Sequence, residues 1–135
     1  MKKFQLIALL AVVTSLFFVA CSKSDDPTPE EGGGASLKVT YKVIASDNVA
    51  IDAISYVNGS PEGASENDIS GTTWTSEELN VPKEALMLYI SASGSTLNNE
   101  DGELTVQILV DGKVVAEGEE TGSFLLPDAA YDIEQ

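Results

Sequence analysis

The strongest constraint on the fold of this chain is a two-residue turn, Asp111 and Gly112, between two strand-like segments. Apolar side chains recur at every second position over residues 104–110, and residues 113–115 resume a β-rich sequence after the turn. A type I′ turn requires positive φ at both central positions, which Asp and Gly tolerate. The sequence therefore predicts an antiparallel β-hairpin in this region.

Further strand-like segments lie along the rest of the chain, separated by turn signals at roughly the 8–12-residue spacing that is typical of a sandwich or barrel. They cover residues 37–43, 49–57, 72–75, 85–93, 123–126 and 131–134. No segment after residue 35 has a helical period, and residues 76–79 are expected to form a loop. The sequence predicts an all-β domain over residues 36–135, a small immunoglobulin-like β-sandwich of about seven antiparallel strands.

The first 20 residues have the pattern of a signal peptide. Lys2 and Lys3 give a positive start, and residues 4–19 are almost all apolar. This stretch of 16 residues is shorter than the ~20 that a spanning helix needs. A positive start, a short apolar core and a small residue before the cleavage site indicate export, so we expect residues 1–20 to be removed.

Cys21, the single cysteine, follows Ala20 directly and precedes a polar run. This arrangement resembles a bacterial lipoprotein signal, in which the cysteine becomes the new N-terminus and carries the lipid. The resemblance implies a membrane anchor through Cys21, because two or more acyl chains hold a protein stably on a membrane. The alternative is an ordinary cleaved signal that leaves a free thiol.

Residues 21–35 are expected to form a disordered acidic and glycine-rich tether without an apolar face. Ser24, Asp25 and Asp26 resemble the short acidic export signal of surface lipoproteins in Bacteroidetes-type bacteria. The alternative is that these acids belong only to a solvated linker. The export signal implies a protein on the surface face of the cell outer membrane, and the linker reading leaves the periplasmic face open.

Charge and missing residue types exclude several function classes. The chain holds 22 acidic residues against 7 lysines, with no arginine and no histidine. Such a surface repels phosphate backbones, so we expect no nucleic-acid partner. Without histidine, and with Cys21 used by the lipid, an imidazole base and a thiol nucleophile are both lacking. We therefore expect no cofactor and no enzymatic activity.

Several short motifs follow one another in the order found in a known family. They are Tyr41-Lys42-Val43, Ile54-Ser55-Tyr56 followed by Asn58-Gly59, Trp74, the set Leu88, Ile90, Ser91 and Ala92, and residues 102–115. In this order they resemble the MmpS-type domain, the small β-sandwich of mycobacterial membrane proteins that accompany large lipid exporters. Similar domains occur in Bacteroidetes lipoproteins. The resemblance implies a sandwich fold and, as an alternative function, a periplasmic accessory subunit of an envelope transporter.

Aromatic residues are the candidates for ligand contact. Trp74 could form a carbohydrate-stacking platform together with Tyr41, Tyr56, Tyr89 and Tyr131. The alternative is core packing, where aromatic side chains contribute most of their burial energy. Tyr41 shares the alternating apolar face of its strand, so it is expected to be buried.

Acidic residues suggest two further sites, neither of which we predict. Residues 98–103 are rich in oxygen ligands, but an EF-hand loop counted back from Gly102 would begin at Leu97, where an acid is required. Asp47 with Asp52, or Glu117 with Glu119, could imitate a glycosidase pair, but such a pair needs a cleft that small sandwiches rarely supply. We expect no metal site and no catalytic residue. The sequence predicts a lipid-anchored, non-catalytic binding or scaffolding module for an unknown protein or glycan.

Overall fold

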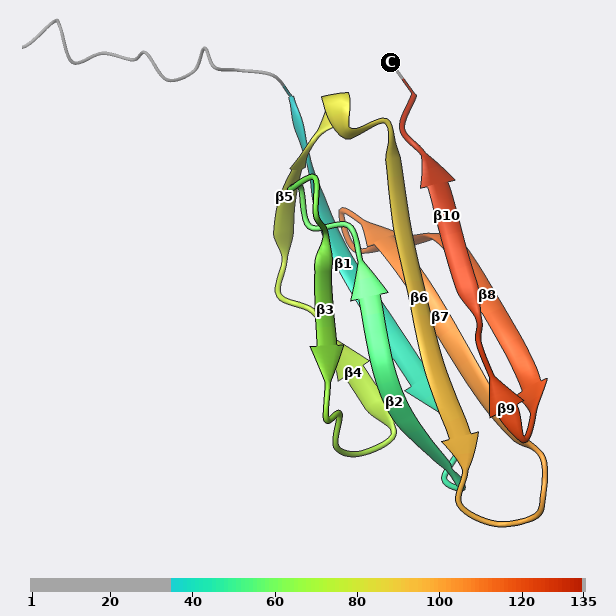
Figure 1. Cartoon of the computed structure of the whole chain (residues 1–135). Coiled ribbons are helices and arrows are strands. Elements are labelled where there is room, and N and C mark those ends of the chain that lie inside the picture. Colours follow the sequence, from blue (N-terminus) through green and yellow to red (C-terminus); the bar gives the residue numbers. More distant parts are fainter. Residues whose placement is uncertain (1–34, 135) are drawn as a thin grey trace, which may run out of the picture. The chain divides into compact units, whose positions relative to one another are not determined.

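The computed structural model describes residues 35–134, and everything below refers to those residues. They form ten strands and one short 3-10 helix in a two-layer sandwich (Figure 1). In chain order the elements are β1 (Ser36–Ala45), β2 (Val49–Tyr56), β3 (Ala64–Asn67), β4 (Thr73–Thr75), β5 (Leu79–Pro82), η1 (Lys83–Ala85), β6 (Met87–Thr96), β7 (Gly102–Val110), β8 (Lys113–Gly122), β9 (Phe124–Leu125) and β10 (Asp128–Asp132).

Both sheets are antiparallel throughout, and each contains five strands. In the first sheet β1 lies beside β7, β7 beside β8, and the other edge of β1 is shared by β4 and β5. In the second sheet the order is β10-β6-β2-β3, and β9 pairs with the far end of β6. The prediction of an all-β antiparallel sandwich is therefore confirmed.

The core lies between the two sheets and is built from alternating residues. In β1 the inward positions Val39, Tyr41, Val43 and Ala45 are buried, while their neighbours face outward. Such period-2 burial is what one covered sheet face produces. The other buried apolar residues are Val49, Ile51, Ile54, Val81, Leu88, Ile90, Ala92, Leu104, Val106, Ile108, Leu125, Ala129 and Ile133.

The predicted hairpin is confirmed in detail. Val110 pairs with Lys113, and both turn residues have positive φ, 51° at Asp111 and 80° at Gly112. The backbone N–H of Asp111 also donates to the carbonyl of Lys38, at 2.9 Å, which ties the turn to β1.

Short edge elements are the main departure from the sequence expectation of about seven strands. Strands β3 and β5 and helix η1 were not expected, because β3 is Ala-Ser-Glu-Asn and β5 ends in proline. Neither segment has a strong strand pattern of its own. They form because β2 and β1 offer them unpaired backbone groups, and Pro82 is tolerated because β5 is an edge strand.

The two sides of the sandwich differ. On one side β8 and β10 lie close together (Figure 1). A Cβ added at Gly118 would meet the carbonyl oxygen of Asp128 at 2.0 Å. The N–H of Leu126 donates to the Glu120 carboxylate on this side, at 2.6 Å. On the other side the edge strands are β3 in one sheet and β4 and β5 in the other. This second side holds the cleft described next.

Candidate functional site

Three side chains from β2, β3 and β4 face the space between the sheets. Trp74 on β4 is opposite Val43, and Glu66 on β3 is opposite Ile54. Because directly paired residues point to the same face, and both partners are buried, Trp74 and Glu66 share the inner face of their sheets. Tyr56 on β2 is opposite the buried Ile90 and points the same way.

The aromatic rings form a series from the core to the edge. The rings of Tyr41 and Tyr56 have centroids 5.1 Å apart at 45°, and those of Tyr56 and Trp74 are 5.3 Å apart at 49°. These are the tilted geometries that aromatic pairs prefer. Tyr41 is fully buried, whereas Tyr56 and Trp74 are half-buried and pack against the core from its margin.

The outer two rings line a cleft of about 400 Å³. Its other walls are Glu66 from β3, Leu79 from β5, Thr75 at the end of β4, and Ser76 and Glu77 between β4 and β5. Ser76 fixes this wall to β1: the N–H of Tyr41 donates to its Oγ at 3.0 Å, and its own N–H donates to the Tyr41 carbonyl at 2.9 Å. This wall of the cleft is therefore held to β1 by two hydrogen bonds between Ser76 and the main chain of Tyr41.

Two carboxylates give the cleft a negative potential. Burial raises the pKa of the Tyr56 hydroxyl, and the charges of Glu66 and Glu77, with a hydrogen bond to Glu66, raise this pKa further. Lys38 is paired with Glu78 at 3.6 Å on the outer side. Within residues 35–134, neither Glu66 nor Glu77 has a lysine at salt-bridge distance.

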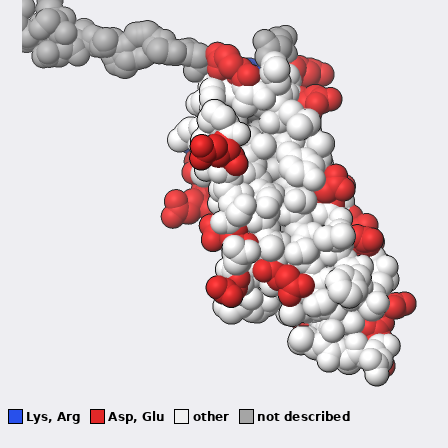
Figure 2. Space-filling model, in the orientation of Figure 1, with Lys and Arg blue, Asp and Glu red and all other residues white. Residues whose placement is uncertain are grey.

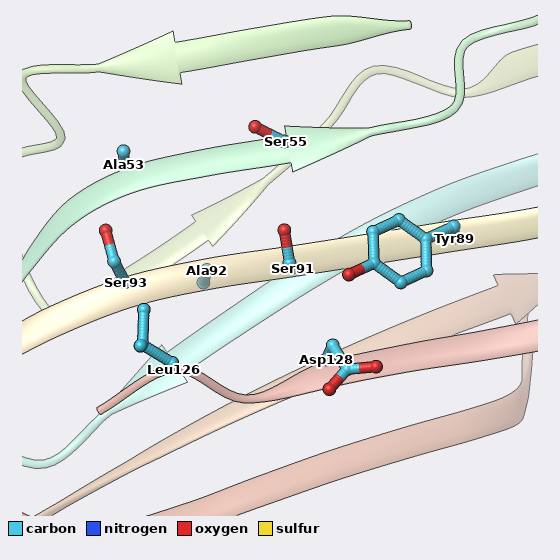
Figure 3. Close-up of a pocket in the computed structure, with 8 residues that line it drawn as sticks. All are labelled: Ala53, Ser55, Tyr89, Ser91, Ala92, Ser93, Leu126 and Asp128. Atoms are coloured by element: carbon cyan, nitrogen blue, oxygen red, sulfur yellow. The ribbon is translucent and has the colours of Figure 1, made fainter.

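A second hollow, of about 290 Å³, lies on the outer face of the sheet β10-β6-β2-β3. Figure 3 shows its lining from β2, β6, β10 and the connection before β10, with the Tyr89 ring at one end and Ser93 beside Leu126 at the other. Its floor is made of small side chains, and it offers a single aromatic ring. The cleft at the sheet edges combines two rings with two carboxylates, so it is the better candidate for a ligand site.

The structure separates the tyrosines that the sequence grouped around Trp74. Tyr41 and Tyr56 are in series with it, whereas Tyr89 is on the outer face and Tyr131 lines a different hollow, beside Val110. The expected burial of Tyr41 is confirmed. Trp74 combines both alternatives, because it packs on the core and also lines the cleft. Ligand contact by Trp74 stays a prediction.

Other sites considered from the sequence have structural explanations. In the 98–103 loop, the Asn98 Oδ1 accepts from the Asn48 amide at 3.1 Å and from the Glu100 N–H at 3.2 Å. No group of three or more acidic, histidine or cysteine side chains in residues 35–134 is arranged to hold a metal ion. Asp52 accepts from the Ser95 hydroxyl at 3.2 Å, and Glu117 accepts from the Gln107 amide.

The sequence-based sites at Cys21, Ser24, Asp25 and Asp26 lie outside the described residues, as do the signal peptide and nearly all of the tether. Within residues 35–134, no helix has the length and apolar character needed to cross a membrane. Lipidation and export remain predictions.

Comparison with known proteins adds a fold likeness. No family model and no curated protein matches the sequence, so the MmpS-type resemblance receives no support from them. Among solved structures, the chain is similar to a domain of unknown function, DUF4425, from Bacteroides vulgatus. The identity is 13%, the TM-score is 0.47, and the match covers 76% of this chain and 99% of that one.

Proposed function

We propose that this chain is a non-catalytic binding module of the cell envelope, anchored in the outer membrane through lipid on Cys21 and facing the cell surface. The ligand enters the cleft beside Tyr56 and Trp74. The sequence predicts that residues 21–35 form a flexible tether, and such a tether would let the domain reach a partner in solution or on a neighbouring surface.

One observation carries the proposal: two half-buried aromatic rings line a cavity of about 400 Å³ at a sheet edge. A ring that only filled the core would gain more by being covered completely, because burial energy scales with the area removed from water. Cavities of this size, with aromatic walls and a few polar groups, are the usual form of small binding sites. A sugar ring or a single side chain of a partner fits this description.

Binding is tested with the parent domain and its Trp74→Leu variant on arrays of oligosaccharides and peptides. Thermal unfolding first establishes that both proteins are folded. We expect ligands that the parent binds and the variant does not, because Trp74 supplies a wall of the cleft. Equal binding by both proteins, or no binding by the parent, would contradict the proposal. Shortened oligosaccharides in the wash would contradict its non-catalytic part.

Anchoring and orientation are tested on intact cells with an external protease, with a periplasmic protein as control. We expect loss of the protein while the control survives, and an intact mass that includes acyl chains on Cys21. Protection of both proteins would contradict the surface assignment. It would favour the alternative, a periplasmic accessory subunit of an envelope transporter.

A further inference from the structure

We infer that the cleft between the sheet edges binds an organic cation, a guanidinium or alkylammonium group, with Tyr56 and Trp74 against its apolar faces and Glu66 and Glu77 as counter-charges. The inference rests on the proposed binding function and names the chemistry of its ligand. The group could belong to an arginine or lysine side chain of a partner protein or to a small amine.

The position of Glu66 supports a cation as the ligand of the cleft. It is on an edge strand, but its pairing with Ile54 turns it toward the inner face, beside aromatic rings. Glu66 is an exposed residue, and the Tyr56 hydroxyl hydrogen-bonds to its carboxylate. Lys38 pairs with Glu78, whereas no lysine of residues 35–134 lies at salt-bridge distance from Glu66. A cation that stacks on the rings therefore meets this carboxylate without displacing a lysine of the described residues.

An inward charge on an edge strand also has a protective use, because it prevents edge-to-edge association of sheets. That use explains a charge on β3 but does not require any second charge. Glu77 comes from the connection between β4 and β5, on the other sheet, and lines the same cleft. Two independent elements thus place carboxylates around one cavity.

The rings supply the second argument. The negative face of an indole attracts a cation more strongly than that of any other side chain, and a phenol does so to a lesser degree. Trp74 and Tyr56 line the cavity together, with ring planes 49° apart, so their surfaces form two adjoining walls. Aromatic walls with carboxylates suit a cation, because a cation gains ionic and cation–π contacts there, whereas a neutral sugar could gain only hydrogen bonds and stacking.

The negative charge of the whole domain also favours a cation as the ligand. The chain has a formal net charge of −15, and Figure 2 shows acidic side chains spread over one side of the domain with almost no basic ones. Such a field attracts cations to the surface without choosing a position for them. A cation that binds specifically in the cleft must be held there by the four residues named above. A test therefore has to separate their contribution from that of the general negative charge.

The experiment follows the fluorescence of Trp74, the single tryptophan of the chain, during titration with N-acetyl-arginine amide. The neutral citrulline analogue, which has the same shape, is titrated in parallel. We expect a saturable change with the arginine compound and at least about tenfold weaker binding of the analogue, since loss of the charge removes both the cation–π and the ionic contacts. Equal binding of both compounds would overturn the inference.

Matched variants separate the cleft from the general field. Glu66→Gln with Glu77→Gln removes two charges from the cleft, and Glu117→Gln with Glu119→Gln removes two from β8. We expect about tenfold weaker binding in the first pair and a change of less than about twofold in the second. Equal weakening would assign the binding to net charge and overturn the inference. The inference would also be overturned if Glu66→Gln kept its affinity and began to self-associate. In that case the Glu66 carboxylate would serve to prevent edge-to-edge association of sheets.

Two further probes distinguish the source and the underlying function. Tighter binding of a five-residue peptide with a central arginine than of ethylguanidinium would point to a partner protein, and the reverse to a small amine. Either result supports the cation site. If a neutral oligosaccharide changes Trp74 fluorescence and no cation does, the inference fails while the proposed binding function stands.

Discussion

At the scale of single residues, Tyr41 stands out in the core because its buried hydroxyl lacks a hydrogen bond that would replace its lost hydration. It is fully buried, and its hydroxyl has no hydrogen-bond partner among the described residues. The main chain of Tyr89 is its polar neighbour, without hydrogen-bonding geometry. A buried hydroxyl without a partner loses its hydration and gains nothing in return. The ring, in contrast, supports Tyr56 and through it the cleft.

This separation of ring from hydroxyl predicts that Tyr41→Phe stabilises the domain by about 1 kcal/mol, because the desolvated hydroxyl is removed and the ring stays. Tyr41→Ala, which also removes the ring, should cost about 3–5 kcal/mol. Urea unfolding of the three proteins measures both differences. A Tyr41→Phe variant less stable than the parent would show that the hydroxyl has a partner after all.

The same residue predicts a loss of stability in alkaline solution. Burial raises the pKa of the Tyr41 hydroxyl above its ordinary value of 10.0. Above pH 10 the unfolded chain releases this proton and the folded domain keeps it, so the free energy of unfolding falls as pH rises, by up to about 1.4 kcal/mol per pH unit. The free energy of unfolding, measured between pH 8 and pH 11.5, should fall in this way for the parent and should fall less for Tyr41→Phe. Parallel curves would contradict the prediction.

At the scale of elements, the side of the sandwich where β8 lies close to β10 depends on the absence of a side chain at Gly118. A Cβ there would lie 2.0 Å from the Asp128 carbonyl oxygen, so the two strands must separate to admit it. In the β7–β8 turn, Gly112 has open space around it and a φ of 80°. The two glycines are therefore needed for different reasons, one for space and one for backbone conformation.

We predict that Gly118→Ala destabilises the domain by at least about 2 kcal/mol, since the new methyl group overlaps a backbone atom that cannot move alone. Gly112→Ala, the matched control, should cost about 1 kcal/mol through its left-handed backbone conformation. Thermal and urea unfolding compare the two. A smaller effect at Gly118 than at Gly112 would show that β8 and β10 separate easily.

At the scale of the whole molecule, the described residues hold a core of their own. Every buried apolar side chain of the cluster lies between Val39 and Ile133, and residues 35–135 form a compact unit by themselves. We predict that a fragment of residues 35–135 unfolds cooperatively, with a midpoint within about 2 °C of the chain that begins at Cys21, because the core cluster between Val39 and Ile133 is kept whole. A clearly lower midpoint would assign a structural role to residues 21–34.

The sequence by itself determined the long strands and one of their pairings, that of β7 with β8 across the Asp111-Gly112 turn. Period-2 alternation in residues 37–43 and 104–110 selects one buried face, and Asp111 with Gly112 joins neighbouring strands by a turn that few other residues allow. These signals are local, so they can be read without knowledge of the fold. Strands β3 and β5 could not be read in this way, because β2 and β1 supply the backbone partners that create them.

Only the tertiary structure decided the site. Trp74 was one aromatic among five candidates, and alternation with Leu88 and Ile90 sets Tyr89 on the outer face without showing which of the other rings meet at a cleft. Glu66 and Glu77 were two acids among 22. Their meeting beside the rings depends on strand register and on how two sheet edges face each other, and such contacts join residues from different strands. The physical reason is that alternation specifies which face a side chain takes, whereas only packing specifies what it faces.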